Sequence, residues 1–298
     1  MQKKSLVFII AIYKREELTK QVLLYYKKLR KKYGFEIVVA GSEGERSRKV
    51  ATGCHYIEVP NFPISEKNNA MMLEAKKFDP DAVVILGSDD FICENVIKHY
   101  YKLIEKGENK VFGFTDLYFY GLQEDILSHY NVGHKSYGAG RYFPRAVLDA
   151  MNWRGWEREL NKGLDGENMQ KVLLSGCEYY SIPLKEIDGF LVDVKSGFNI
   201  SRKEIIFVGK QVNVEMMEEK GIKVRRTRGT KKKVEETTEE VKSVDYQAKP
   251  IPEGLKENDS ITVYGTGQNK HIPKDRREKV DVAMARKLIK IGAVVYKG

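Results

Sequence analysis

The chain has 298 residues, of which 42% are hydrophobic, so it can form one large domain or two unequal ones with a real core. The longest apolar run, Leu6 to Ile12, is far shorter than the roughly 20 residues of a membrane-spanning helix, so no membrane span is predicted. The net charge of +10 is uneven, because residues 1–205 hold 31 Lys and Arg against 28 Asp and Glu, whereas residues 206–298 hold 21 against 14.

The cysteines point to a reducing compartment. Cys54, Cys93 and Cys177 are odd in number and far apart, which indicates neither a disulfide framework nor a zinc site. A cytoplasmic location fits this composition best. Lysines before the first apolar run imitate a secretory leader, but YKREE follows where a cleavage site would have to stand, so a first strand is predicted there.

The first part of the chain alternates strand and helix patterns. Continuous apolar strands are predicted at 5–13, 35–42, 55–60 and 81–90, with amphipathic helices from Glu16 and from Glu66. Strands of this kind, separated by helices, are typical of an α/β fold whose mostly parallel sheet is covered by helices on both faces. Ligands bind such sheets at the carboxyl ends of the strands, which is where Asp89 and Asp90 end the fourth strand.

The pattern changes after Asp90. Helices are predicted at 94–107 and 156–176, and a Gly-rich turn that leads into a helix is predicted at 137–153. An aromatic strand-like stretch is predicted at 110–122, and two short strands precede a domain end near residue 205. A charged linker is predicted at 206–257. Residues 258–298 predict a small α+β module with a helix that has Asp281 near its start and Gly292 beyond its end. About 40 residues are marginal for independent folding, so this module is expected to lean on the main domain or to form a homo-oligomer.

Four short motifs follow one another in this pattern: EKNNAM after the third strand, SDD after the fourth, then GAGRYF, and GLDGEN at the start of a helix. Their order resembles that of inverting, family-2-like glycosyltransferases with the GT-A fold. The resemblance covers residues 5–200. It implies a GT-A (Rossmann-like) domain at 1–205 and transfer of a sugar from a nucleotide-diphosphate-sugar donor to an acceptor, with Mn²⁺ or Mg²⁺ as cofactor.

The paired carboxylates are the candidate metal ligands. A leaving nucleoside diphosphate needs cations to stabilise its charge, and hard oxygen ligands suit Mg²⁺ or Mn²⁺. The resemblance assigns the metal to Asp90 and Asp89, gives Asp89 a supporting role at the donor, and places Ser88 where many relatives carry Asp. From the residues alone, either Asp could instead cap the helix that begins near Glu94.

The resemblance also implies donor contacts from several strand ends. The expected donor-binding residues are Ala11, Tyr13, Lys67, Asn68, Asn69, Ser88, Asp89 and Lys195. Asn before an apolar helix is equally a good N-cap, so that assignment has an alternative. Asp193 and Lys195 stand where relatives often bring a His toward the metal and phosphates.

Asp165 in GLDGEN is the candidate catalytic base, because inverting transfer needs one carboxylate to take the proton of the acceptor hydroxyl. An N-cap role is its alternative. The resemblance puts Gly140, Arg141 and Trp156 on the acceptor side. Aromatic faces stack on sugar rings, but core packing is the alternative for each tryptophan.

Other functions stay open from the sequence. A non-catalytic carbohydrate-binding or virion-associated protein is one, and a sugar-nucleotidyltransferase is another, although AIYKREEL lacks the phosphate loop that the latter needs. The block from Lys220 to Lys242 is interpreted as a solvated linker or as a contact for a polyanion. The expected acceptor is a glycan or a protein, or a modified nucleic acid if the basic block binds DNA. The C-terminal module resembles small modules of tailed bacteriophages, which implies a phage-encoded enzyme acting in the host cytoplasm.

Overall fold

The computed structural model describes residues 5–131, 133, 136–157, 159–196, 206–207, 209–225, 260–265, 277–281 and 294–295. The chain divides into two compact units, Met1–Gly229 and Thr230–Gly298. No helix among the described residues is long and apolar enough to cross a membrane.

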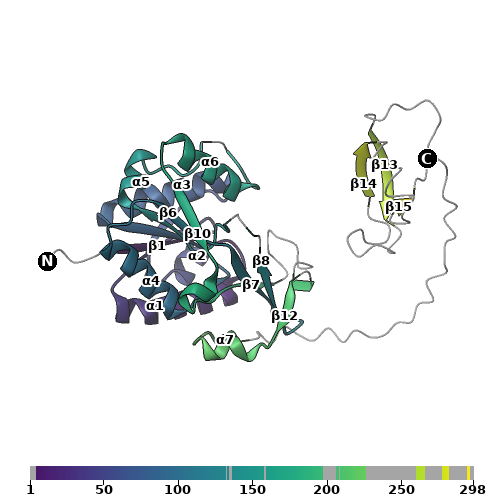
Figure 1. The fold of residues 1–298 in the computed structure, drawn as a ribbon, viewed down its shortest axis with the longest axis horizontal. Helices are drawn as coiled ribbons and strands as arrows, with labels where there is room; N and C mark the ends of the chain where they lie inside the picture. The colour runs from purple at the N-terminus through teal and green to yellow at the C-terminus, as the bar shows by residue number, and fades with distance from the viewer. Residues whose placement is uncertain are drawn as a thin grey trace. The chain divides into compact units, whose positions relative to one another are not determined.

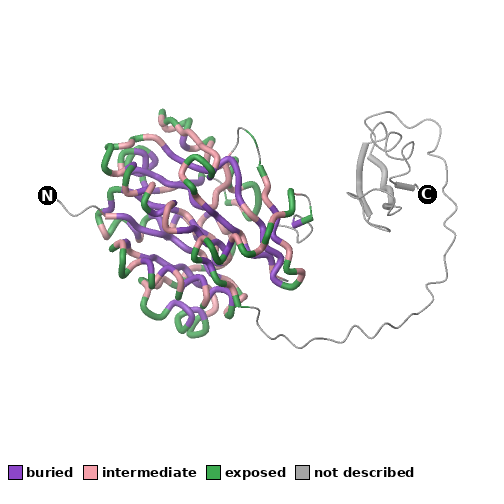
Figure 2. Tube along the Cα trace, turned by 60° about the horizontal axis from the view of Figure 1, so that its bottom comes forward, coloured by how far each residue is buried: buried purple, intermediate pink, exposed green. Residues whose placement is uncertain are grey.

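A seven-stranded sheet forms the centre of the first unit (Figure 1). Its spatial order is β10-β6-β9-β4-β1-β2-β3, and only β9 runs against the other strands. The strands are β1 (Leu6–Ala11), β2 (Glu36–Gly41), β3 (His55–Glu58), β4 (Ala82–Gly87), β6 (Val111–Phe114), β9 (Arg141–Pro144) and β10 (Tyr179–Ile182). Strands β1 and β4, and β2 after Glu36, consist of apolar residues and glycine because both faces of the sheet are covered. Figure 2 shows long buried stretches of chain in the interior of the first unit.

Helices cover the two faces of this sheet with separate hydrophobic clusters. Helices α1 (Glu16–Tyr33) and α4 (Glu94–Glu105) pack on the face that carries Phe8 and Val84. Helices α3 (Ile64–Ala75), α5 (Arg145–Ala150) and α6 (Leu164–Leu174) pack on the face that carries Ile9 and Val83. The predicted α/β class, a mostly parallel sheet with helices on both faces, is confirmed.

A second sheet of five strands begins where β4 ends. Its order is β12-β8-β7-β11-β5, and its strands are β5 (Asp90–Ile92), β7 (Asp116–Gly121), β8 (Ile126–Asn131), β11 (Leu191–Lys195) and β12 (Lys210–Val212). Strand β5 runs antiparallel to β11. The chain therefore leaves the central sheet between Gly87 and Asp90, which puts SDD at the junction of the two sheets. The short elements α2 (Glu45–Val50), η1 (Lys76–Phe78), η2 (Leu184–Ile187) and α7 (Glu215–Glu219) complete the unit.

The first unit extends beyond the domain end expected near residue 205. Strand β12 pairs with β8, and Met217 of α7 is buried in the core, so the expected linker start lies inside this unit. The second unit contains the antiparallel strands β13 (Ser260–Gly265), β14 (Arg277–Asp281) and β15 (Val294–Val295). The helix expected after Asp281 lies outside the described residues. The remaining bounds of the linker and of the C-terminal module stay predictions.

Candidate active site

Three carboxylates meet at the junction of the two sheets. Asp89 and Asp90 follow β4, and Asp193 on β11 lies directly opposite Asp90 on β5. One oxygen from each of the three lies within 4.8 Å of the others. Like charges directly opposite on paired strands repel each other, so this arrangement destabilises the fold unless a cation neutralises it.

The backbone holds this acidic cluster of Asp89, Asp90 and Asp193 in place. The Gly87 N–H donates a hydrogen bond to the Asp90 carboxylate. A Cβ on Gly87 would approach Asp89 Oδ1 to 2.7 Å and Asp90 Oδ2 to 2.9 Å, so only glycine leaves room for both side chains. The buried Tyr26 hydroxyl donates to the Asp90 carbonyl at 2.9 Å and accepts the Ile92 N–H at 3.1 Å, which fixes the short strand β5 to helix α1.

Two cations from the protein accompany the cluster. Arg15, in the turn after β1, donates from Nη1 to Asp89 Oδ2 at 2.5 Å and from Nη2 to Ser88 Oγ at 2.9 Å. Lys195 donates to Asp193 Oδ2 at 2.6 Å and is itself buried. Its ammonium also lies 4.8 Å from the centre of the Phe119 ring. Three carboxylates therefore face two protein cations.

Burial and mutual repulsion disturb the ionisation of the cluster. Burial is the main cause that raises the pKa of Asp90 well above its usual range, and the charges of Asp89 and Asp193 raise it further. Burial and then Asp89 raise the pKa of Asp193 to about 7, against the opposing effect of Lys195. The cluster thus lacks positive charge, which a bound cation would supply.

The residues of the cluster fit a divalent cation. Oδ1 of Asp193 is buried and has no hydrogen-bond partner, so it can accept a further contact. Carboxylate oxygens at this spacing are the donor set that Mg²⁺ and Mn²⁺ prefer, and both ions usually take the rest of their coordination from water and substrate phosphates.

Lys67 of α3 joins the carboxyl ends of three neighbouring strands. Its ammonium donates to the Ile12 carbonyl at 2.8 Å, to Asn61 Oδ1 at 3.2 Å and to Ser42 Oγ at 3.4 Å. These three partners follow β1, β3 and β2 respectively. Lys67 therefore links the segments that follow β1, β2 and β3 through contacts within the protein, and its donor contact stays a prediction.

The buried ammonium of Lys67 makes the stability of the protein depend on pH. Burial lowers the pKa of Lys67 to about 8, against the raising effect of Glu43 and Glu58. The unfolded chain, with an ordinary Lys pKa of about 10.4, binds more protons between these values, so the free energy of unfolding should rise with pH by about 3 kcal/mol across that window. In urea unfolding from pH 7 to pH 10.5, the difference between wild type and Lys67→Met should show this rise. A difference that stays flat would contradict it.

Asp165 lies against the Gly-rich turn. A Cβ on Gly138 would collide with the Asp165 carboxylate, so glycine is required for this approach. The Tyr137 hydroxyl near this corner is buried without a hydrogen-bond partner. Its pKa is raised by burial first, and among its weaker causes are the charges of both Asp165 and Asp193. Asp165 and Asp193 thus both lie within electrostatic range of one side chain.

Arg141 supports this corner from inside the protein. It is 1% exposed and donates to Asn168 Oδ1 at 2.7 Å, to the Ser136 carbonyl at 3.2 Å and to the Asp165 carbonyl at 3.4 Å. It therefore links β9 to the first turn of α6. Gly140 forms the buried turn before it, with φ of 73° and a carbonyl that accepts the Tyr100 hydroxyl.

The structure buries both tryptophans. Trp156 is 2% exposed, its indole N–H donates to the Leu164 carbonyl, and its backbone exchanges two hydrogen bonds with the Asn69 amide. Trp153 is 1% exposed in the same hydrophobic cluster. These contacts give Asn69 and the tryptophans packing roles that join α3 to the segment before α6.

The other expected donor-binding residues lie at or after the carboxyl ends of β1, β3 and β4. Ala11 is the last residue of β1, and Tyr13 follows it with its ring 6.2 Å from that of the exposed Phe62. Asn68 is half-buried on α3, and Ser88 is buried beneath Arg15. The structure thus brings the residues after β1, β3 and β4 to one edge of the central sheet.

Comparison with known proteins finds likeness only at the level of structure. No protein-family model and no curated protein sequence matches this chain. S. aureus TarS, solved in complex with UDP-GlcNAc, is 13% identical with a TM-score of 0.46, over 65% of this chain and 60% of that one. The mannosyltransferase PcManGT from Pyrobaculum calidifontis, solved with GDP-Man and Mn²⁺, is 15% identical with a TM-score of 0.46, over 66% of this chain and 58% of that one.

Both solved structures hold a nucleotide sugar. The present chain spans less than two thirds of the length of either. At this identity the likeness concerns the fold alone, so the function of the chain rests on the chemistry of its own site.

Arg15 and Gly87 are the site residues that sequence reasoning missed. Arg15 stands in YKREE, where the charged run gave evidence only against a cleavage site. A cation immediately after the first strand of a parallel sheet could have been placed at the ligand edge, next to the Asp pair after the neighbouring strand β4.

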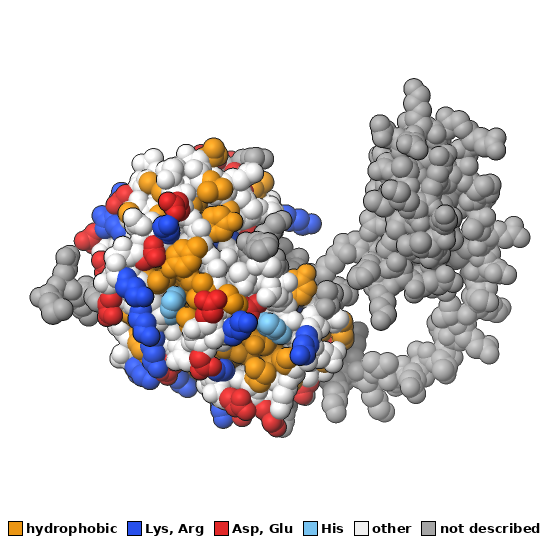
Figure 3. Space-filling view, viewed as in Figure 1, with side chains coloured by type: hydrophobic (Ala, Val, Ile, Leu, Met, Phe, Trp, Pro, Cys, Tyr) orange, Lys and Arg blue, Asp and Glu red, His pale blue; other side chains and the backbone are white. Residues whose placement is uncertain are grey.

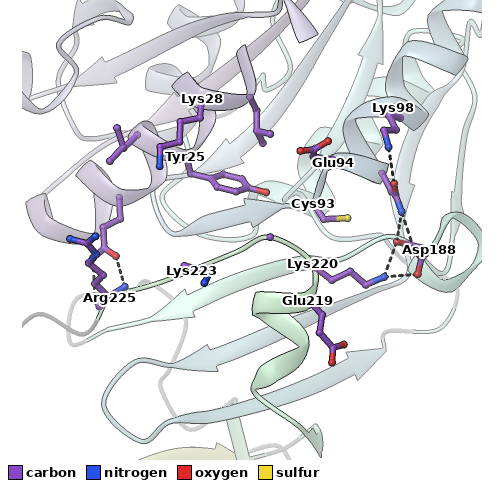
Figure 4. Close-up of a pocket in the computed structure, with 15 residues that line it drawn as sticks. Tyr25, Lys28, Cys93, Glu94, Lys98, Asp188, Glu219, Lys220, Lys223 and Arg225 are labelled. Carbon is purple, nitrogen blue, oxygen red and sulfur yellow. Dashed lines mark hydrogen bonds and ion pairs between the residues drawn. The ribbon is translucent and has the colours of Figure 1, made fainter. Parts of the chain in front are cut away.

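The face of the first unit seen in Figure 3 carries charges of both signs, with Lys and Arg side chains interspersed with Asp and Glu around hydrophobic groups. A cavity of about 820 Å³ lies between α1, α4 and the segment after α7, away from the acidic cluster. Figure 4 shows the pairing of Lys220 with Asp188 at its edge, and cations and carboxylates both line it.

Proposed function

We propose that the first unit is an inverting glycosyltransferase that takes a sugar from a nucleotide-diphosphate-sugar donor and uses a divalent cation. The observation that carries the proposal is the acidic cluster at the carboxyl end of β4, whose orphan oxygen on Asp193 and raised pKa values call for a cation. Arg15 and Lys195 pair with two of these carboxylates, but three carboxylates crowded at the ligand edge of a parallel sheet with raised pKa values are typical of a functional site.

The donor diphosphate has a place next to this cluster. Bound between Asp89, Asp90 and Asp193, Mn²⁺ or Mg²⁺ would offset the charge that develops on the leaving diphosphate. Lys195 adds a buried positive charge on the same side. We place the nucleoside beside the rings of Tyr13 and Phe62, which lie past the carboxyl ends of β1 and β3.

Asp165 has the position of the base in this proposal. It takes the proton from the acceptor hydroxyl while the hydroxyl oxygen bonds to the anomeric carbon and the bond from that carbon to the diphosphate oxygen breaks. The proton ends on Asp165 and the electron pair leaves with the nucleoside diphosphate. Gly138 leaves the space that the carboxylate needs, and Arg141 fixes the turn of α6 that carries it.

A binding and turnover panel on the wild-type protein tests the proposal. UDP, GDP, UDP-GlcNAc and GDP-Man are added with Mn²⁺ or with a chelator, and thermal stability and release of nucleoside diphosphate are measured. We expect one nucleotide class to raise the melting temperature only with Mn²⁺, because a ligand that binds the folded state stabilises it. No shift with any nucleotide in either condition would refute the proposal.

A further inference from the structure

Arg15 pairs with a carboxylate of the candidate metal site. Its guanidinium contacts Asp89 Oδ2 at 2.5 Å, and the two side chains are only 11% and 13% exposed. The same group binds Ser88, the residue before the Asp pair. Loss of one partner from a buried ion pair leaves an uncompensated charge, so a metal ion that approaches Asp89 competes with Arg15.

The turn that presents Arg15 has an unusual backbone. Lys14 and Arg15 are adjacent non-glycine residues in the left-handed region, with φ of 55° and 52°. Hydrogen bonds hold the turn, from Lys14 N–H to Glu43 at 2.7 Å and from Thr19 N–H to the Arg15 carbonyl at 2.9 Å. Strained backbone of this kind persists where the surroundings enforce it, often at ligand sites. Here it directs Arg15 at the acidic cluster.

Two buried side-chain atoms at this site, one hydrogen-bond donor and one acceptor, have no hydrogen-bond partner. Arg15 Nε is a donor without an acceptor, and Asp193 Oδ1 is an acceptor without a donor. Buried polar atoms are nearly always satisfied, so both gaps need an explanation. An anion would satisfy Arg15 and a cation would satisfy Asp193. A divalent cation bound to a diphosphate supplies both at once.

The charge balance favours the same pair of ligands. With all three carboxylates ionised, as a bound cation requires, they leave one negative charge in excess over Arg15 and Lys195, and a divalent cation would convert it into one positive charge in excess. The metal-loaded cluster would then attract a diphosphate, and a bound diphosphate would in turn stabilise the metal.

We infer that Arg15 is a positioning residue that couples binding of the divalent cation to binding of the nucleoside diphosphate. Without ligands it pairs with Asp89 and weakens metal binding. When both ligands are present, its guanidinium turns from Asp89 to a phosphate oxygen, which leaves Asp89 for the metal. The inference rests on the proposed function and adds that neither ligand alone binds well.

Binding of Mn²⁺ followed by electron paramagnetic resonance tests the coupling without any turnover. Wild type, Arg15→Gln, Arg15→Lys and the control Arg46→Gln, whose exposed side chain pairs with Glu16, are titrated with and without UDP or GDP. Wild type should bind Mn²⁺ about tenfold or more tightly with the matching nucleotide, within the usual range of coupling between sites. Arg15→Gln should bind Mn²⁺ alone more tightly than wild type and lose most of the coupling.

Arg46→Gln and Arg15→Lys distinguish an effect of the Arg15 side chain from a general effect of removing a charge. Arg46→Gln should behave as wild type, and Arg15→Lys should retain part of the coupling because it keeps the charge but has fewer donors. Coupling in Arg15→Gln equal to that of wild type, with unchanged affinity for Mn²⁺ alone, would overturn the inference and leave the proposed function standing. Absence of Mn²⁺ binding by wild type with every nucleotide would overturn both.

Discussion

Asp90→Asn should abolish the Mn²⁺-dependent stabilisation by nucleoside diphosphate. Asn keeps an oxygen that can accept the Gly87 N–H but removes the charge that a divalent cation requires. A ligand at a hundred times its Kd stabilises by about 2.7 kcal/mol, or roughly 5–10 °C in Tm for a unit of this size, so the lost shift is easy to measure. Sugar transfer should fall by on the order of 100-fold or more.

The same variant should be more stable than wild type in chelator. Asp90 lies opposite Asp193 and near Asp89, so removal of its charge relieves repulsion that no metal offsets under those conditions. We expect a gain of about 1 kcal/mol, equivalent to roughly 2–4 °C. A metal ligand should show both effects, a lost shift in Tm with Mn²⁺ and a higher Tm in chelator. A residue that only supports the fold should lower the Tm in both conditions.

Asp79→Asn is the matched control. Asp79 lies before β4, at the other end of the strand from Asp90, and its exposed carboxylate pairs with Arg145. Its loss should leave the metal-dependent shift unchanged. Retention of the full shift by Asp90→Asn would remove Asp90 from the metal site, and a loss of stability in chelator would assign it a purely structural role.

Hydrophobic pattern was sufficient to predict the parallel strands of the central sheet, but not its antiparallel strand β9. The runs that became β1, β2 and β4 lack polar alternation because both faces are covered, and the spacing of Leu18, Val22 and Leu29 matches the buried side of α1. Strands β5 and β9 were not predicted. Each is only three or four residues long, and their positions depend on pairing with distant strands rather than on local pattern.

The acidic cluster was predicted in part, for a reason of topology. Asp89 and Asp90 are adjacent in the sequence, so their pairing was visible, but Asp193 meets them only because β11 pairs with β5 across a separation of about a hundred residues. Arg15 arrives from the turn of β1 because β1 and β4 are neighbours in the sheet. Sequence separation conceals such contacts, and strand order reveals them.

The roles of the tryptophans and of Asn69 could not be predicted from residue type. The sequence left core packing open as the alternative for the tryptophans and an N-cap role as the alternative for Asn69. Hydrogen bonds between the Asn69 amide and the Trp156 backbone satisfy both groups inside the protein. Chemistry alone could not distinguish these roles, because the deciding quantity is burial.

Asp165→Asn should eliminate sugar transfer while donor and metal binding persist. Asn cannot take the acceptor proton, so kcat should fall on the order of 10²- to 10⁴-fold. The Mn²⁺-dependent shift with nucleoside diphosphate should match that of wild type, because Asp165 lies against Gly138 and outside the acidic cluster. Stopped assays of nucleoside diphosphate release, together with thermal stability, measure the two effects on one sample.

Glu167→Gln is the control within the same helical turn. Glu167 and Asp165 both lie in the first turn of α6, two residues apart, and neighbours at that spacing do not face the same side of a helix. Near-normal transfer by Glu167→Gln and loss by Asp165→Asn would assign the base. Loss in Glu167→Gln alone would move the base to Glu167. If Asp165→Asn loses the metal-dependent shift as well, Asp165 acts in donor binding, since a residue that only accepts the acceptor proton has no part in holding the donor.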